Sequence, residues 1–386
     1  MTGRTRESAI ASRKTSRRKD ESSIRERVGQ LLIIGFDGTE MSAGLASLLE
    51  RVQPAGVILF ARNIVTAQQT YKLLKECQQH VSTPLFRCVD LEGGKVDRLR
   101  KVIGPAPSAA EVYASGARKL FRLHGRVIGS NCRALGFNVD FAPALDLAFE
   151  ASRTVMESRL VSDDPNEAIV YVREFLAGLS TAGVFGNGKH YPGLGEGKLD
   201  SHHDLPVIEK SWKRLWAEDL VPYRTLRSQL PFVMVSHAAY PAVTKEATPA
   251  SLSKKWITDI LRKKIGYRGL IASDDLEMGG VLAAAPIEQA AVGHIRAGGD
   301  LCLICHKEEF VTRTYEELIR TVETDRSFAR RANESIAHVL AFKKKNPQLA
   351  RWAPPPTNEK VQALSRRLWE FNEQVRLDTI HNQETA

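Results

Sequence analysis

Eight short apolar runs, each followed by a polar or amphipathic stretch, recur along the chain and limit the folds that it can adopt. The runs are continuous rather than alternating in hydrophobicity, which is typical of parallel strands buried on both faces. A regular succession of strands and helices predicts a parallel sheet, and eight repeats predict a closed (β/α)8 barrel of the TIM type, an α/β fold. The predicted strands lie within residues 31–36, 56–60, 85–90, 137–145, 183–191, 232–237, 269–274 and 300–305.

Amphipathic segments between the runs predict the helices that cover the sheet, at about 66–81, 110–135, 166–182, 211–229, 253–265 and 286–297. After about residue 322 only helical patterns remain, at 326–345 and 359–376. Pro354-Pro355-Pro356 separates these two because proline cannot continue a helix. The main alternative is an open doubly wound sheet. It is disfavoured because no glycine-rich dinucleotide-binding turn follows the first run.

These patterns divide the chain into four segments. We expect a basic N-terminal arm at 1–27, a single catalytic barrel domain at 28–322, helices packing on the barrel at 323–376 and a tail at 377–386. The arm holds nine Lys/Arg against four acidic residues, half of the chain's formal net charge of +10. It has no apolar stretch for a signal peptide and no aromatic residue to stack on bases. We therefore expect a disordered, solvated arm and no nucleic-acid partner.

Cysteine usage and hydropathy bear on the compartment. No apolar run approaches the roughly 18 residues that a membrane span needs, so we expect no membrane partner. The five cysteines are an odd number scattered through apolar or helical stretches, which favours reduced thiols over a disulfide framework. We expect a cytoplasmic protein. A monomer is favoured, although the sequence leaves the oligomeric state open.

Ionisable residues follow several predicted strands at the points where those strands end. Because the carboxyl ends of barrel strands meet at one rim, these side chains should converge there. A purely structural barrel has no need for so many ionisable groups on one rim, so the convergence predicts an active site. The residues are Asp90, Glu92, Asp146, Lys189, His190, His237, Asp274 and Asp275.

Asp274 is the sharpest candidate for chemistry because it closes the seventh apolar run and is followed directly by Asp275. A carboxylate held rigidly at a strand end can act as a nucleophile on an anomeric carbon. The structural alternative is that one of the pair caps the following helix, since Asp is a favoured N-cap. The two interpretations are compatible if Asp274 is catalytic and Asp275 is structural.

A second group is needed to protonate the leaving oxygen, and the glycine-rich segment 189–204 offers a histidine for this role. Asp200 and His202 lie two residues apart there. An aspartate can orient a histidine and stabilise its charged form, and a histidine exchanges protons near neutral pH. His202, His203 and Asp204 also suggest a metal site, but they lack the further well-spaced ligand typical of zinc. We expect no metal and no cofactor.

Three motifs in this order resemble glycoside hydrolase family 3, in particular its single-domain β-N-acetylglucosaminidase branch. The family's KHFPGHG…DSH signature appears as KHYPGLGEGKLDSH at 189–202. Its D-x-EGG-x-V-x-R element appears as DLEGGKVDR at 90–98, and its SDDL-x-M element appears as SDDLEM at 273–278. The resemblance runs from about residue 28 to about residue 345.

The resemblance implies a retaining glycoside hydrolase that removes a terminal non-reducing β-linked N-acetylglucosamine through a covalent glycosyl-enzyme. It implies Asp274 as the nucleophile and His202, paired with Asp200, as the acid/base. It implies a sugar-binding set that consists of Asp90, Arg98, Arg159, Lys189 and His190.

Three positions depart from the family's usual pattern. Leu194 stands where the family usually has His, and Leu91 and Lys95 replace the more usual Gln and Arg. These departures leave the proposed nucleophile and dyad intact. They bear on the preference for the leaving group and on the rate rather than on the reaction type.

The same resemblance suggests the substrate, a small carbohydrate such as a muropeptide or anhydro-muropeptide derived from peptidoglycan. Two alternatives stay open. One is a phosphorolytic β-N-acetylglucosaminidase or β-glucosidase, and a histidine acid/base suits it because no carboxylate then faces the anionic phosphate. The other is a sugar-binding protein with little turnover, which the intact Asp274, His202 and Asp200 disfavour.

Overall fold

The structure, a computed structural model, describes residues 27–152, 156–196 and 205–385. Eight parallel strands form one sheet in the order β6-β3-β2-β1-β10-β9-β8-β7. Asp140 N donates to Phe185 O at 2.8 Å and Asn187 N to Ala142 O at 2.8 Å, which joins the edge strands β6 and β7 into a barrel. The predicted (β/α)8 barrel is confirmed. Its strands are β1 Leu32–Ile34, β2 Gly56–Ile58, β3 Phe86–Val89, β6 Val139–Asp140, β7 Asn187–Tyr191, β8 Phe232–Val235, β9 Leu270–Asp275 and β10 Leu301–Ile304.

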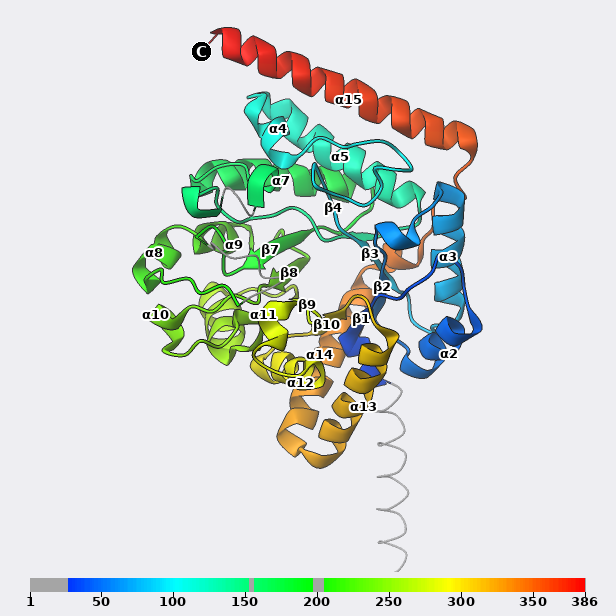
Figure 1. Cartoon of the computed structure of the whole chain (residues 1–386), viewed down its shortest axis with the longest axis vertical. Helices are drawn as coiled ribbons and strands as arrows, with labels where there is room; N and C mark the ends of the chain where they lie inside the picture. Colours follow the sequence, from blue (N-terminus) through cyan, green and yellow to red (C-terminus); the bar gives the residue numbers. More distant parts are fainter. Residues whose placement is uncertain (1–26, 153–155, 197–204, 386) are drawn as a thin grey trace, which may run out of the picture.

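Helices surround these strands (Figure 1). Between successive strands lie α2 Ala43–Val52, α3 Ala67–Gln79, α5 Arg118–Ala134, α7 Pro165–Thr181, α8 Trp212–Ala217, α9 Leu220–Leu226, the π-helix η6 Lys255–Ile265 and α12 Ile287–Ala297, and α13 Glu308–Thr324 follows β10. Shorter elements stand on the loops: α4 Ala109–Ala114, α10 Pro241–Thr244, α11 Gly279–Leu282 and an antiparallel pair formed by β4 Leu91–Gly93 and β5 Val96–Asp97. The sequence patterns predicted neither α2 nor α13.

Two helices that the pattern predicts as continuous are interrupted. The segment 110–135 divides into α4 and α5 around Gly116, whose φ of +67° ends the first helix. The segment 211–229 divides into α8 and α9 at Glu218, where φ is −123° and ψ is −90°. The carboxylates of Glu218 and Asp219 contact the buried Lys210 at this break. Local ion pairing therefore overrides the helical pattern there.

The amino ends of the strands are closed by α14 Arg326–Lys345. The Phe342 ring lies 5.9 Å from the Phe86 ring and 5.4 Å from the Phe232 ring, between centroids. Together with Val339, these rings extend a core of inward-facing strand side chains inside the barrel. The barrel is thus a packed cylinder that α14 seals at one end, which leaves the carboxyl ends of the strands for a site.

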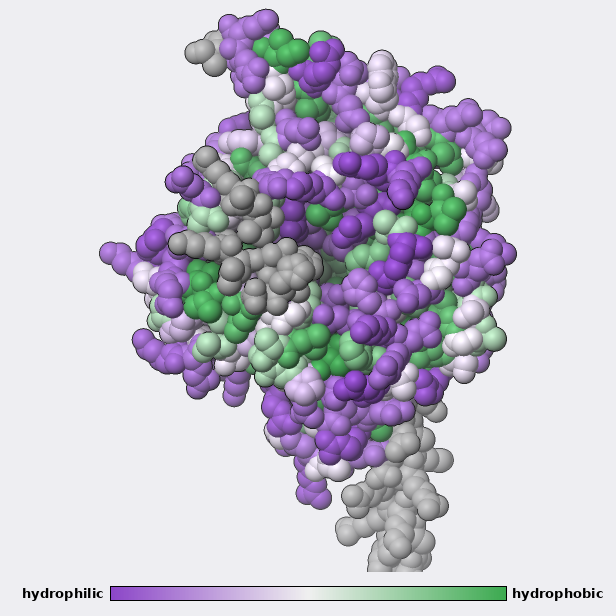
Figure 2. All heavy atoms as spheres, viewed as in Figure 1, coloured by the Kyte–Doolittle hydropathy of each residue, from purple (hydrophilic) through white to green (hydrophobic). Residues whose placement is uncertain are grey.

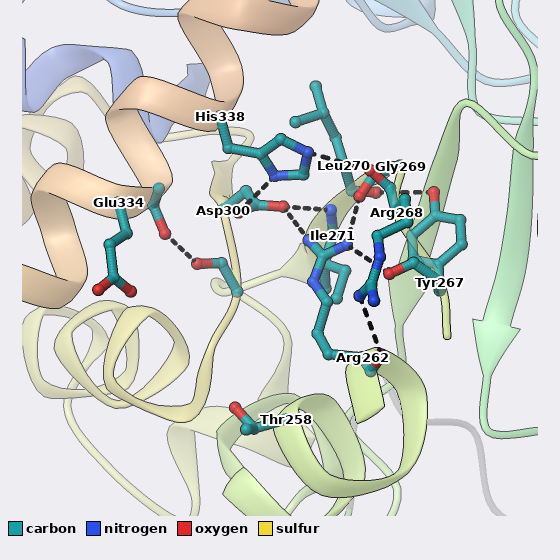
Figure 3. A network of polar contacts seen from close by, with 12 residues as sticks. Thr258, Arg262, Tyr267, Arg268, Gly269, Leu270, Ile271, Asp300, Glu334 and His338 are labelled. Carbon is teal, nitrogen blue, oxygen red and sulfur yellow. Dashed lines mark hydrogen bonds and ion pairs between the residues drawn. The ribbon is translucent and has the colours of Figure 1, made fainter. Parts of the chain in front are cut away.

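A buried ionic network lies beside this seal, at the amino end of β10 (Figure 3). Asp300, which is 1% exposed, accepts a hydrogen bond from Ile271 N at 2.8 Å and pairs with Arg262 of η6. His338 of α14 contacts the other carboxylate oxygen through Nδ1 at 3.2 Å, and its Nε2 lies 3.0 Å from Arg268 O. The network joins β9, β10, η6 and α14 through one carboxylate.

The last helix is longer than the sequence pattern predicts. α15 Asn358–Thr385 lies across α4 and α5 (Figure 1), and it buries Leu364, Leu368, Phe371 and Val375. The predicted end at residue 376, with a tail beyond it, is wrong as far as Thr385. Residues 377–385 contain neither glycine nor proline, so nothing in them stops the helix.

Some expectations concern residues at or beyond the edges of the description. Apart from Arg27, the basic arm lies outside the described residues, so its disorder stays a prediction. Among the described helices, none is long and apolar enough to cross a membrane. All five cysteines are buried free thiols. Figure 2 shows hydrophilic side chains over most of the viewed face, with apolar ones in small groups.

Candidate active site

The carboxyl end of β9 carries two adjacent aspartates in different surroundings. Asp275 is bound by its own turn, because its Oδ1 accepts a hydrogen bond from Glu277 N at 3.0 Å and its Oδ2 lies 3.2 Å from His306 Nε2. Helix α11 begins beyond this turn, after Met278, so neither aspartate is its N-cap. Asp275 therefore caps a turn and not a helix. Asp274 is free of this role.

Asp274 is half-buried, and its Oδ1 accepts a hydrogen bond from Asp275 N at 2.9 Å. Among the described residues, no side chain donates a hydrogen bond to its carboxylate. Burial alone would raise the pKa of Asp274, but electrostatic interactions with His190, His237 and Lys189 and the hydrogen bond from Asp275 N lower the pKa below its usual value. The carboxylate is thus ionised at neutral pH with lone pairs available, as a nucleophile requires.

A cluster of two carboxylates and two cations lies on the neighbouring strands. Lys189 of β7 places its Nζ 2.8 Å from Asp90 Oδ1 and 2.6 Å from Glu92 Oε1. Arg159, from the turn before α7, binds Glu92 with two hydrogen bonds of 2.9 and 2.8 Å. Glu92 is 4% exposed, so two cations share one buried carboxylate. The planar guanidinium and the paired geometry hold Arg159 rigidly.

The same contacts fix the charge states of this cluster. Burial raises the pKa of Glu92, but Arg159 and Lys189 outweigh burial and keep the pKa well below the usual range. Burial lowers the pKa of Lys189, but Asp90 and Glu92 raise it above its usual value. Glu92 and Lys189 therefore stay charged near neutral pH, and Glu92 cannot supply a proton there.

His190 follows Lys189 and is oriented by Asp146. Its Nδ1 lies 2.7 Å from Asp146 Oδ2, and its Nε2 lies 3.3 Å from Arg159 Nη2. The other oxygen of Asp146 accepts a hydrogen bond from Leu194 N at 2.7 Å. One buried carboxylate thus sets both the histidine ring and the start of the glycine-rich loop. Leu194, the departure from the family's usual histidine, is buried at this point.

Arg98 has no such fixed partner. Its guanidinium carbon lies 5.6 Å from the centroid of the Phe60 ring, and its buried Nε makes no hydrogen bond with any described residue. A buried donor without a partner is uncommon in proteins and indicates a group that binds something else. The predicted role of Arg98 in substrate binding stays a prediction.

Two further side chains support the site. The sequence placed His237 at the rim without assigning it a role, and it did not single out Asp140. His237 donates from Nε2 to Asp275 O, at 2.9 Å, and its Nδ1 lies 2.7 Å from Ser251 Oγ. Asp140 at the end of β6 accepts a hydrogen bond from Leu91 N at 2.9 Å, next to Glu92. Burial raises the pKa of Asp140 well above its usual value. The position of Asp140 inside the apolar run 137–145 was the sequence feature that could have identified it.

The remaining predicted residues cannot be placed. Asp200 and His202 lie outside the described residues, so their pairing and their role as acid/base stay predictions. His203 and Asp204 lie there as well. Within the described ranges, no group of three or more His, Cys, Asp or Glu side chains is arranged to hold a metal ion.

The arrangement resembles that of known proteins over most of the chain. Residues 23–342 match the Glycosyl hydrolase family 3 N terminal domain. A Beta-hexosaminidase from Xanthomonas oryzae pv. oryzae is 35% identical over 285 residues, which cover 72% of this chain and 84% of that protein. A Beta-hexosaminidase from Stenotrophomonas maltophilia is 33% identical over 285 residues, with the same coverage of both chains.

A solved structure gives the same result in three dimensions. The glycoside hydrolase family 3 β-N-acetylglucosaminidase from a Paenibacillus species is 32% identical, with a TM-score of 0.83. The match covers 90% of this chain and 68% of that one. The domain match, the sequence relatives and the barrel agree, and the chain belongs to glycosyl hydrolase family 3.

Proposed function

We propose that the protein removes terminal non-reducing β-linked N-acetylglucosamine by a retaining mechanism, with Asp274 as the nucleophile. The observation that carries the proposal is the Asp274 carboxylate, which is held at a strand end, has a pKa below its usual value, and accepts no hydrogen bond from a described side chain. The relatives named Beta-hexosaminidase and the Paenibacillus β-N-acetylglucosaminidase support the choice of sugar.

The proposed reaction has two steps. Asp274 attacks the anomeric carbon while the glycosidic C–O bond breaks, and His202 gives its proton to the leaving oxygen. In the second step His202 takes a proton from water, which attacks the same carbon and releases Asp274 from the sugar ester. Asp200 orients His202 and stabilises its charged form. A histidine needs no raised pKa to work as an acid near neutral pH, unlike a carboxylic acid.

The proposed sugar contacts come from the buried ionic cluster and its neighbours. Asp90 and His190 present acceptors for hydroxyl groups, and Lys189 presents donors that are already aligned by two carboxylates. Arg98 brings a guanidinium with an unmatched donor. Rigid, pre-paired groups lose little entropy on binding and hold the anomeric carbon near the nucleophile. The proposed set is Asp90, Arg98, Arg159, Lys189 and His190.

For the natural substrate we propose a fragment of peptidoglycan that carries the terminal sugar, met in the cytoplasm by a monomeric enzyme. Five buried free thiols suit a reducing compartment. We propose hydrolysis rather than phosphorolysis because the relatives are named Beta-hexosaminidase. The test therefore compares turnover with and without phosphate.

The test is turnover of 4-nitrophenyl β-N-acetylglucosaminide in phosphate-free buffer and in added phosphate. We expect release of free N-acetylglucosamine at a rate that phosphate leaves unchanged. Formation of a sugar phosphate would favour the phosphorolytic alternative. Binding of N-acetylglucosamine without release of nitrophenol would favour the sugar-binding alternative.

A further inference from the structure

A buried lysine outside the sugar-binding cluster lies at the root of the loop that follows β7. Lys210 is 2% exposed. Its Nζ lies 2.6 Å from Glu218 Oε2, 2.6 Å from Asp219 Oδ2 and 4.0 Å from the centroid of the Phe149 ring. Enclosing a charge costs free energy that good pairing must offset. Because burying the Lys210 charge costs free energy, we expect this lysine to have a role beyond packing.

A third carboxylate of this cluster belongs to the loop itself. Glu196 Oε1 lies 3.6 Å from Lys210 Nζ and 2.7 Å from Arg214 Nη2. Glu196 is the last described residue before the segment 197–204, which carries Asp200 and His202 in the sequence. Two cations therefore hold the loop by the side chain at which that segment begins.

The residues just before Glu196 are fixed by further contacts. Tyr240 donates from its hydroxyl group to Gly193 O at 2.6 Å. Gly193 has a φ of +137°, and a Cβ there would lie 2.8 Å from the Cβ of Asp219, so the loop packs directly on a partner of Lys210. The next residue, Leu194, is held by Asp146. The close approach of Gly193 to Asp219 and the positive φ explain why glycine is needed at position 193.

The chain is fixed again after the undescribed segment. Ile208 N donates to Ala239 O at 2.9 Å, and Ala239 N donates to Pro206 O at 2.8 Å. Lys210 follows two residues later. The lysine therefore joins the first described residues after the segment to the last one before it.

We propose that Lys210 is a positioning residue for proton transfer. It holds Glu196 against Glu218 and Asp219 and so fixes the point from which the segment bearing Asp200 and His202 leaves the barrel. The proposal rests on the acid/base role proposed above for His202. Within the described part of the chain, Lys210 makes no ion pair with the sugar-binding set, so its effect should fall on leaving-group protonation rather than on sugar binding.

Charge balance gives the physical reason. Without Lys210, Glu196 and Glu218 keep only the half-exposed Arg214 as a paired cation, and Asp219 loses the charge that stabilises its ionised form. Burial raises the pKa of Asp219 to about 6 even though Lys210 opposes the rise. Like charges this close repel, and Glu196 is the partner that can move toward solvent.

The experiment compares two leaving groups in Lys210→Met, which keeps an unbranched apolar stem and removes the charge. We measure kcat/KM, which reports the glycosylation step, on phenyl and 2,4-dinitrophenyl β-N-acetylglucosaminides. Phenoxide needs a proton from the acid and dinitrophenoxide does not. We expect a fall of about 10²-fold with the phenyl substrate and of less than about threefold with the dinitrophenyl substrate. Inhibition by free N-acetylglucosamine should be unchanged.

Two further variants keep the test sharp if Lys210→Met folds poorly. Glu196→Gln removes the charge of the loop residue that faces Lys210, at a side chain that is 26% exposed. Its kcat/KM should also fall more on the phenyl than on the dinitrophenyl substrate, by a smaller factor than in Lys210→Met. The matched control is Lys343→Met, which removes another buried lysine, at the sealed end of the barrel. Lys343 donates hydrogen bonds to the neutral Gln30 and Thr83 there, and its Nζ lies 5.0 Å from the centroid of the Phe86 ring. Its loss should alter the melting temperature without favouring either substrate.

Each outcome decides the matter. Equal losses on the two substrates in Lys210→Met and Glu196→Gln, or no loss on either, would overturn the positioning role. His202→Ala is measured in parallel, and if it lacks the split, the acid/base assignment itself fails. If His202→Ala shows the split and the Lys210 and Glu196 variants do not, only the inference about Lys210 fails.

Discussion

Two buried ionic networks lie at opposite ends of the same barrel, and they are completed differently. At the amino ends of the strands, Asp300 Oδ2 accepts a hydrogen bond from Ile271 N and pairs with Arg262, and its Oδ1 lies 3.2 Å from His338 Nδ1 (Figure 3). At the carboxyl ends, Glu92 is just as saturated, but Asp274 beside it receives no side-chain donor from the described residues, and Arg98 keeps an unmatched donor.

We infer from this difference that the first network stabilises the fold and that the second serves a ligand. Buried polar groups in folded proteins usually find partners, and at the carboxyl ends of the strands a ligand can supply the partner that Asp274 and Arg98 lack. In barrels of this type, chemistry belongs to the carboxyl ends of the strands and stability to the amino ends. Substitutions at the two ends should therefore affect different measurements.

The largest effect is expected from Asp274→Ala. Removing the proposed nucleophile should abolish the covalent path, so kcat should fall about 10⁴-fold or more. Calorimetry should show a melting temperature close to that of the wild type, and N-acetylglucosamine should still bind, because the sugar-binding set is untouched. A variant that keeps most of its activity would remove the distinction between the two ends.

The next effect is expected from Glu92→Gln, which leaves Lys189 and Arg159 with weaker, uncharged pairing. Misalignment of two proposed sugar contacts should lower kcat/KM about 10²-fold. Steady-state kinetics on 4-nitrophenyl β-N-acetylglucosaminide measure this, normalised to folded protein. Unchanged kinetics would mean that the cluster, like that of Asp300, is structural.

At the other end, Asp300→Asn should leave kcat/KM per folded molecule unchanged and destabilise the fold. Breaking a buried pair leaves the Arg262 charge without its partner, which should cost about 3 kcal/mol of unfolding free energy. Urea titration measures the loss. The matched control is Asp259→Asn, in the π-helix η6 that also carries Arg262. The exposed ion pair of Asp259 with Lys263 should contribute less than about 1 kcal/mol to the free energy of unfolding.

The smallest effect is a pH dependence of that stability difference. Burial raises the pKa of Asp300, but Arg262 and His338 outweigh burial and bring the pKa below its usual value of 3.8. A depressed carboxyl pKa stabilises the folded state above the unfolded pKa, and this stability is lost as the pH falls through the folded value. The difference between wild type and Asp300→Asn should therefore shrink below about pH 4. A difference that grows on acidification would contradict the ion-pair account.

Eight continuous hydrophobic runs, together with the absence of a glycine-rich turn after the first, predicted the barrel, because parallel strands buried on both faces are apolar throughout. The strand ends also predicted where Asp274, Lys189 and His190 would meet, since parallel strands bring their carboxyl ends together. The proposed roles of Asp90, Arg98 and Arg159 in sugar binding came from the family resemblance. Periodicity alone gives no such detail.

Other features depend on contacts between residues far apart in sequence. The break between α8 and α9 follows from burial of Lys210 against Glu218 and Asp219, and no local pattern reports that contact. The length of α15 depends on its packing against α4 and α5. Likewise, the orientation of His190 by Asp146 joins residues 44 positions apart.

The most direct test of the central claim is to trap the covalent intermediate. A fluorinated N-acetylglucosaminyl donor with a good leaving group, which slows release of the sugar ester, is incubated with the enzyme, and the peptides are analysed by mass spectrometry. The account predicts one sugar attached to the peptide that contains 273–278, at Asp274, and no attachment in Asp274→Ala. Labelling of a different carboxylate, or turnover of the donor with no trapped ester, would contradict it.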